Sequence, residues 1–82
     1  MAIKNWKATK YKSRNYSMWM NTLPQYRTFD QNYIVTVGRV GTTSDFFMEV
    51  SKARRQIRVN QYTNFNDAKA SAVRYMRSHP NG

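Results

Sequence analysis

The middle of the chain alternates apolar and polar positions with a period of two. Residues 33–40 contain a run of β-branched side chains, and residues 46–52 resume the alternation with apolar residues at every second position. Successive side chains of a strand point to opposite faces, so both segments are predicted to be strands. The Gly, Ser and Asp residues between them are typical of a loop that joins antiparallel neighbours.

A third alternating run follows after residue 55. Ile57 and Val59 alternate there with polar side chains that are expected to point outward, which are Arg58, Asn60 and Tyr62. Together the three runs predict a three-stranded antiparallel meander over residues 32–62.

The period changes to that of a helix over residues 65–79. Asn64 or Asn66 can cap its start, and Asp67 lies where the positive end of a helix favours a carboxylate. At about 100° per residue, one side of this helix collects mainly apolar side chains, which are Phe65, Ala68, Ala72, Tyr75, Met76 and His79. Arg74 and Arg77 fall opposite. We therefore expect the helix to pack on one face of the sheet with its arginines outward.

The first third of the chain, residues 1–29, interleaves basic and aromatic side chains. In one interpretation, residues 6–11 and 16–21 are two short strands joined by a turn at 12–15, because aromatic residues favour strands and Ser and Asn favour turns. In another, the segment is an arm that orders only on its partner. A cleavable presequence fits less well, since the segment is rich in Lys and contains two Trp. Pro24 interrupts the pattern, so residues 21–31 are expected to form a connection between the N-terminal segment and the central strands.

These elements predict one small α+β domain over residues 1–82, in which the central meander is extended by an N-terminal β-hairpin and one C-terminal helix packs on one face. A chain this short buries a thin core. The element order over residues 33–78 resembles the sheet-reading DNA-binding modules of some phage-type integrases and certain plant domains. That resemblance implies that the face away from the helix meets the major groove of DNA.

The charge of the chain indicates what kind of partner it binds. The chain has 14 Lys and Arg against 4 Asp and Glu, a net charge of +10 on 82 residues. Six of the basic residues and none of the acids lie within residues 1–29. Such an excess favours polyanionic partners, above all nucleic acid. No apolar run approaches the roughly 20 residues that a membrane-spanning helix needs, and no signal peptide is recognisable, so a cytoplasmic or nucleoid-associated location is expected.

The residue types offer little for catalysis. With no Cys and a single His, a transition-metal site has too few ligands, and no cofactor motif is present. Glu49 is the only acid on a predicted strand, and pairing with Arg58 or Lys52 across the sheet explains it more simply than acid–base chemistry. The sequence therefore predicts a protein that is not an enzyme.

Candidate nucleic-acid-binding residues gather in two places, the N-terminal third and the junction before the third strand. Cations there can neutralise phosphates, and neighbouring polar groups can reach backbone or base edges. The candidates are Lys7, Lys10, Tyr11, Lys12, Arg14, Lys52, Arg54, Arg55, Arg58 and Asn60. Rings that could stack on bases are Trp6, Tyr16 and Tyr62. Lys69, Arg74 and Arg77 on the helix are expected to form a solvated face that adds to the field.

The leading hypothesis is a non-enzymatic protein that binds nucleic acid mainly through the phosphate backbone, with duplex DNA favoured over RNA. The alternative is a small protein-interaction module, such as a phage- or archaeal-type regulator or a ribonucleoprotein subunit, that binds an acidic protein partner. A homodimer stays open.

Overall fold

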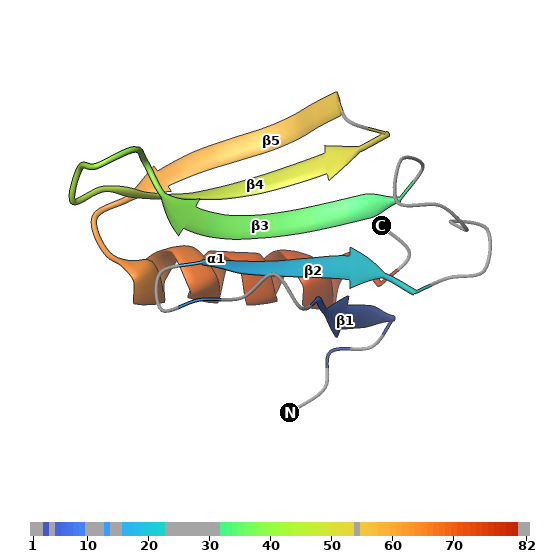
Figure 1. The fold of residues 1–82 in the computed structure, drawn as a ribbon. Coiled ribbons are helices and arrows are strands. Elements are labelled where there is room, and N and C mark those ends of the chain that lie inside the picture. The colour runs from blue at the N-terminus through green and yellow to red at the C-terminus, as the bar shows by residue number, and fades with distance from the viewer. Residues whose placement is uncertain are drawn as a thin grey trace.

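Five antiparallel strands form one sheet, and a single helix packs on one of its faces in the computed structural model of the chain (Figure 1). The structure describes residues 3, 5–9, 13, 16–22, 32–53 and 55–80. Neighbouring strands in the sequence are also neighbours in the sheet. The elements are β1 (Trp6–Ala8), β2 (Ser17–Asn21), β3 (Tyr33–Arg39), β4 (Phe46–Lys52), β5 (Arg55–Tyr62) and α1 (Phe65–Ser78).

The N-terminal segment pairs with the meander as a hairpin. β1 and β2 are antiparallel, with Trp6 opposite Asn21 and Ala8 opposite Trp19, and β2 continues the sheet beside β3. The predicted α+β class, the meander, the N-terminal hairpin and the packed helix are thus confirmed. The predicted turn at 12–15 lies outside the described residues except for Ser13, and so does most of the connection at 21–31.

The core lies between the sheet and α1. We call the face of the sheet against which α1 packs the helix side, and the opposite face the open face. Alternate residues of β3 and β4 point to the helix side, where they meet two alanines and a methionine of α1. The fully buried members are Val35, Val37, Met48, Val50, Ala68, Ala72 and Met76. Because alanine is small, Ala68 and Ala72 let the helix approach the strands closely.

Local signals define both ends of α1. The Asn64 side chain caps the first turn, its Oδ1 accepting a hydrogen bond of 2.8 Å from the backbone N–H of Asp67. At the other end, the Trp6 indole donates to the carbonyl of His79 at 3.0 Å, and the Asn21 amide donates to the carbonyl of Pro80 at 3.1 Å. The residues that directly follow α1 are therefore tied to β1 and β2.

The polar side chains of β5 face opposite to the prediction. Tyr62, Asn60 and Arg58 lie opposite Phe46, Met48 and Val50 of β4, and directly paired residues share a face, so all three lie on the helix side. Val59 lies opposite Glu49 on the open face and is 48% exposed, and Ile57 is 53% exposed. The prediction that Arg58, Asn60 and Tyr62 point away from the core layer was wrong. α1 packs mainly on β3 and β4, so edge strand β5 can hold polar groups on the helix side.

Candidate nucleic-acid interface

Positive charge among the described residues is concentrated on the helix side. Lys52 is paired with Tyr33 on one side and with Arg55 on the other, so all three side chains share a face. This face is the helix side, because Tyr33 alternates with the buried Val35 along β3. Lys7, opposite Met20, is the described cation on the open face. The described cations on the helix side are Arg39, Lys52, Arg55 and Arg58 from the strands and Lys69, Arg74 and Arg77 from α1.

Carboxylates among the described residues lie apart from these cations. Glu49 is on the open face, and its Oε2 accepts a hydrogen bond of 2.8 Å from the Gln56 side chain. The sequence predicted that Glu49 pairs with Arg58 or Lys52. This prediction was wrong, because Glu49 lies on the open face and both cations lie on the helix side. Asp67 lies in the first turn of α1 and Asp45 in the loop before β4. Among the described residues, Arg58, Lys69, Arg74 and Arg77 thus form no ion pair with a carboxylate.

A polar hollow of about 220 Å³ lies between β5 and α1, and we call it the β5–α1 hollow. Arg58 and Arg74 line it from the strand and the helix, and its described lining includes no carboxylate. A chain of hydrogen bonds crosses it: the Asn60 amide donates to the Tyr62 hydroxyl at 3.3 Å, which donates to Ser71 Oγ at 2.6 Å. These contacts hold side chains of the strand and the helix in one arrangement.

The aromatic wall of this hollow is also fixed. The rings of Tyr75 and His79 stack with centroids 4.1 Å apart. His79 Nδ1 lies 2.9 Å from the carbonyl oxygen of Tyr75, and since a carbonyl only accepts, this nitrogen carries the proton of that hydrogen bond. Both rings are therefore engaged with each other on the last turn of α1.

The electrostatics of the hollow favour negative charge at Tyr62. Its phenol pKa lies below the ordinary value of 10.0, chiefly because the Ser71 hydroxyl can reverse its role and donate to the phenolate. Burial opposes this shift, while Asn60 and the charges of Arg58 and Arg74 add to it. Burial instead raises the pKa of Tyr75. The hollow thus stabilises an oxyanion at Tyr62.

We expect the two tyrosines to titrate in opposite directions from free tyrosine. In carbon NMR of ring-labelled tyrosine, Tyr62 should ionise below pH 10.0 and Tyr75 above it. Because the folded state has the lower pKa at Tyr62, the stability that this group contributes grows as the pH rises through that pKa and is lost as the pH falls back through it. Ser71→Ala should move the Tyr62 midpoint upward, and a midpoint at or above 10.0 in the unmodified protein would contradict the assignment.

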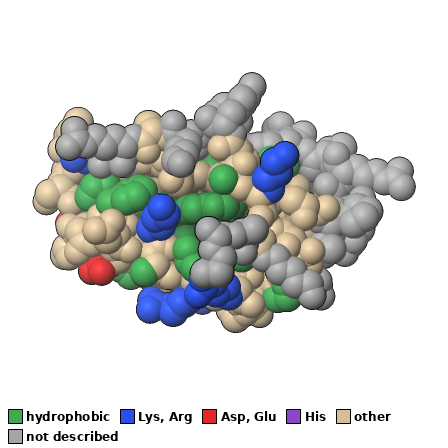
Figure 2. All heavy atoms as spheres, turned by 90° about the horizontal axis from the view of Figure 1, so that it is seen from below, with side chains coloured by type: hydrophobic (Ala, Val, Ile, Leu, Met, Phe, Trp, Pro, Cys, Tyr) green, Lys and Arg blue, Asp and Glu red, His purple; other side chains and the backbone are tan. Residues whose placement is uncertain are grey.

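A second, shallower hollow lies along the outer face of α1 and extends the positive surface. It has a volume of about 430 Å³ and includes Lys69, Arg74 and Arg77 in its lining. Arg74 lines both hollows, so the two join four cations into one surface across the helix side. We call this surface the basic belt; its members are Arg58, Arg74, Arg77 and Lys69. In Figure 2, separate blue Lys and Arg side chains lie beside and between green apolar patches, and red acidic side chains are visible toward one end.

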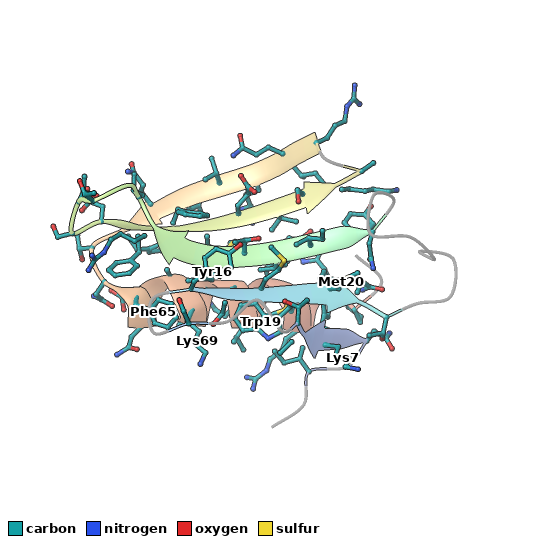
Figure 3. All side chains as sticks on the ribbon, viewed as in Figure 1. Lys7, Tyr16, Trp19, Met20, Phe65 and Lys69 are labelled. Carbon is teal, nitrogen blue, oxygen red and sulfur yellow. The ribbon has the colours of Figure 1, made fainter. Side chains whose placement is uncertain are left out.

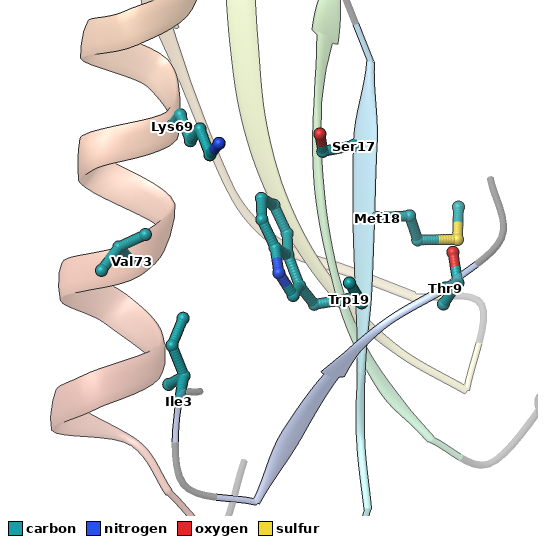
Figure 4. Close-up of a pocket in the computed structure, with 8 residues that line it drawn as sticks. Ile3, Thr9, Ser17, Met18, Trp19, Lys69 and Val73 are labelled. Atoms are coloured by element: carbon teal, nitrogen blue, oxygen red, sulfur yellow. The ribbon is translucent and has the colours of Figure 1, made fainter. Parts of the chain in front are cut away.

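An apolar groove borders the belt on its far side. It lies between α1 and the first two strands, and Lys69 is its cation among the described lining residues. Figure 4 shows the Trp19 ring between β2 and the helix, facing Lys69 and Val73. Trp19 is buried and belongs to the core. Most of the described lining of this groove is apolar, and its polar groups are the hydroxyls of Thr9 and Ser17 and the Lys69 ammonium, so it offers a phosphate one cation against the two of the β5–α1 hollow.

The structure does not bring the two predicted basic clusters together where it describes them. Lys7 lies on edge strand β1 (Figure 3), on the open face. Arg58 lies on the helix side of the opposite edge strand, β5. Lys52 Nζ lies 4.8 Å from the centroid of the Tyr33 ring, a cation–π contact. The predicted residues that lie outside the described part of the chain are Lys10, Tyr11, Lys12, Arg14 and Arg54.

The three rings that were predicted to stack on bases are all engaged in contacts within the protein. Trp6 is 5% exposed and packs in the core, so its ring is not available to a base. Tyr16 is half-buried on the open face, where a methyl group added at Gly38 would come within 3.0 Å of its ring. Tyr62 is held by its hydrogen bonds in the β5–α1 hollow. None of these described rings stands free as a stacking platform.

One flank of α1 has a role that was not predicted from the sequence. Ser71, Arg74, Tyr75 and Ser78 recur at helical spacing and all line the β5–α1 hollow. This spacing was a usable signal, because residues three and four apart share a side of a helix. The helix arginines were instead expected only to add to the general field.

Comparison of the chain with protein-family models, curated proteins and solved structures found no match. Within the part of the chain that the structure describes, no helix is both long enough and apolar enough to cross a bilayer. No three potential metal-ligating side chains gather among those same residues.

Proposed function

We propose that this protein binds nucleic acid without catalysing a reaction, and that the helix side is its principal contact surface. The observation that supports this proposal is the basic belt, four cations joined across β5 and α1 by two hollows that share Arg74. A net charge of +10 supports the same class of partner. Lys and Arg that neutralise phosphates release counterions from the nucleic acid, and this release drives binding.

Duplex DNA is the proposed substrate class. Proteins that bind single strands use exposed rings as stacking platforms, and the described rings beside the belt are engaged elsewhere: Tyr75 stacks on His79 and Tyr62 bonds to Ser71. Contacts from Lys and Arg to phosphates position a protein on a duplex but carry no sequence information. We therefore propose binding with little sequence preference.

The proposed surface differs from the one that sheet-reading modules use. On the open face, the described charged residues are Lys7 and Glu49, which gives that face little attraction for phosphates. The belt on the opposite side has the stronger field. This contrast supplies a direct test with single substitutions.

The test measures fluorescence anisotropy of a short labelled duplex with two charge-reversed variants. Both Arg77 and Lys7 are exposed, so each can be replaced by Glu without disturbing the core. We expect micromolar or tighter binding by the unmodified protein at about 50 mM salt. Arg77→Glu should weaken it about tenfold, and Lys7→Glu no more than about threefold. A duplex of RNA is the comparison ligand.

Two results would contradict the proposal in different ways. No binding to either duplex at low salt would remove nucleic acid as the partner. A larger loss for Lys7→Glu than for Arg77→Glu would move the interface to the open face or the N-terminal segment.

A protein-interaction module is a second candidate, because the open face exposes apolar side chains. Ile57 and Val59 are about half exposed, and Val59 and Phe47 line a hollow on that face. Exposed apolar surface of this kind is common at protein interfaces. A protein partner retained after nuclease treatment and high salt, but lost with Val59→Gln, would favour this function.

A further inference from the structure

We propose that the β5–α1 hollow holds one phosphate group of the bound nucleic acid, with Arg58 and Arg74 as its two cationic ligands. This inference rests on the proposed function and adds a defined subsite to it. The hollow has a volume of about 220 Å³ and is lined by both arginines together with Asn60, Tyr62 and Ser71. Its two cations come from two elements, β5 and α1, whereas the other cations of the belt, Lys69 and Arg77, lie on the outer surface of α1 alone.

The two guanidinium groups approach the hollow from different elements. Arg58 comes from β5 and Arg74 from α1, and among the described residues neither forms an ion pair or hydrogen bond with a carboxylate. Arginine presents a planar fork of donors that matches the oxygens of a phosphate. Two forks on opposite walls can therefore hold one tetrahedral anion from two sides.

Neutral donors of the hollow complete the environment of an anion. One N–H of the Asn60 amide donates to Tyr62, and the other is left for a ligand. The Ser71 hydroxyl accepts from Tyr62, so its own hydrogen can be donated further. The lowered pKa of Tyr62 indicates that negative charge is favoured at this place. Donors and charge thus point to the same class of ligand.

The charge of the hollow selects among ligands. Two positive charges and no carboxylate in the described lining repel a metal cation. They attract a phosphate, which carries between one and two negative charges in a diester or a monoester. A backbone phosphate has two non-ester oxygens on a tetrahedral phosphorus, so it can accept from donors on two walls, whereas both oxygens of a carboxylate lie in one plane.

The first experiment measures the subsite apart from nucleic acid. Inorganic phosphate is added to the labelled protein at constant ionic strength, and proton–nitrogen NMR follows the arginine Nε–H and side-chain amide signals. We expect saturable shifts at Arg58, Arg74 and Asn60, with no such shifts on adding chloride. Arg58→Gln combined with Arg74→Gln should abolish the shift at Asn60. Equal, unsaturable shifts at all arginines would overturn the subsite.

The second experiment compares two double variants that lose the same charge. Arg58→Gln with Arg74→Gln empties the hollow of its cations, while Lys69→Gln with Arg77→Gln removes two exposed cations of the belt outside it. The hollow pair should lower duplex affinity about 10- to 100-fold, since charged hydrogen bonds are lost. The control pair should lower it about three- to tenfold. Circular dichroism checks that both variants keep the fold.

The outcomes separate this inference from the proposed function. Equal losses in the two double variants, with the duplex still bound by the unmodified protein, would overturn the subsite and leave nucleic-acid binding standing. Saturable phosphate shifts without duplex binding would support an anion site while removing the proposed function. A duplex with a phosphate at each strand end and one without it distinguish a terminal phosphate from a backbone phosphate as the occupant.

Discussion

Raising the salt concentration from about 50 to about 200 mM is expected to weaken duplex binding by about 10²-fold if the four cations of the basic belt each neutralise one phosphate. If Lys52 and Arg55, which lie on the same side of the sheet, also contact phosphates, the loss rises to about 10³-fold. The physical reason is the release of counterions from the duplex, which becomes less favourable as salt is added. Anisotropy titrations at several salt concentrations give the slope directly.

Two single substitutions, one in the belt and one outside it, test whether the slope comes from the belt. Arg77→Gln should reduce the slope of log affinity against log salt by about 1, because one phosphate contact is lost. Lys7→Gln should leave the slope nearly unchanged, since Lys7 lies on the open face. An affinity that does not change with salt would show that the belt does not bind phosphates.

The substitution Met76→Ala is expected to destabilise the domain by about 2–5 kcal/mol. Met76 is 0% exposed and is among the largest fully buried side chains between α1 and the sheet. Its loss removes apolar burial and leaves a cavity that the surrounding strands fill only in part. Since small domains have a total stability of about 5–15 kcal/mol, this single change should consume much of it. Urea denaturation followed by circular dichroism measures the change.

The matched control for this substitution is Val59→Ala. Val59 is 48% exposed on the open face of edge strand β5, so truncating it should change the free energy of unfolding by no more than about 0.5 kcal/mol. A cost below about 1 kcal/mol for Met76→Ala would mean that the layer between helix and sheet is loosely packed.

Hydrophobic periodicity predicted most of the fold because the buried faces are continuous. β3 and β4 are covered by α1. In β4, buried positions alternate with partly exposed ones as in the sequence, whereas β3 is buried at every position from Ile34 to Gly38. The helix was predicted from its cap and its apolar side, and its observed span agrees with the prediction to within one residue. Trp6 and Trp19 could not be assigned from sequence, since a tryptophan suits a thin core and a binding surface equally well.

The orientation of β5 could not be predicted, because it depends on tertiary structure. Apolar and polar side chains alternate along β5, but the pairing of β5 with β4 decides which of the two sets faces the helix. This pairing shifts register between Val50 and Ser51. A bulge of this kind changes which residues share a face. The exposed positions of Ile57 and Val59 follow from that register and from the place of β5 at the edge.

The sequence predicted some residues of the candidate site but not that they lie together. Arg58 and Asn60 were chosen by residue type, and both line the β5–α1 hollow. Arg74 became their neighbour only through the packing of α1 beside β5, which no local pattern encodes. A site shared between a strand and a helix thus has to be found from the fold.

The hydrogen bond from the Trp6 indole to the carbonyl of His79 also has a consequence for the order of folding. The two residues are 73 positions apart, whereas each strand of the meander pairs with its neighbour in sequence. Neighbouring strands can pair early because they close short loops, and the bond between Trp6 and His79 comes late because it closes almost the whole chain. During synthesis, the indole of the first strand finds its acceptor only after residue 79 has left the ribosome. The strand made first can therefore pair with β2 early, and its bond to the end of the helix forms last.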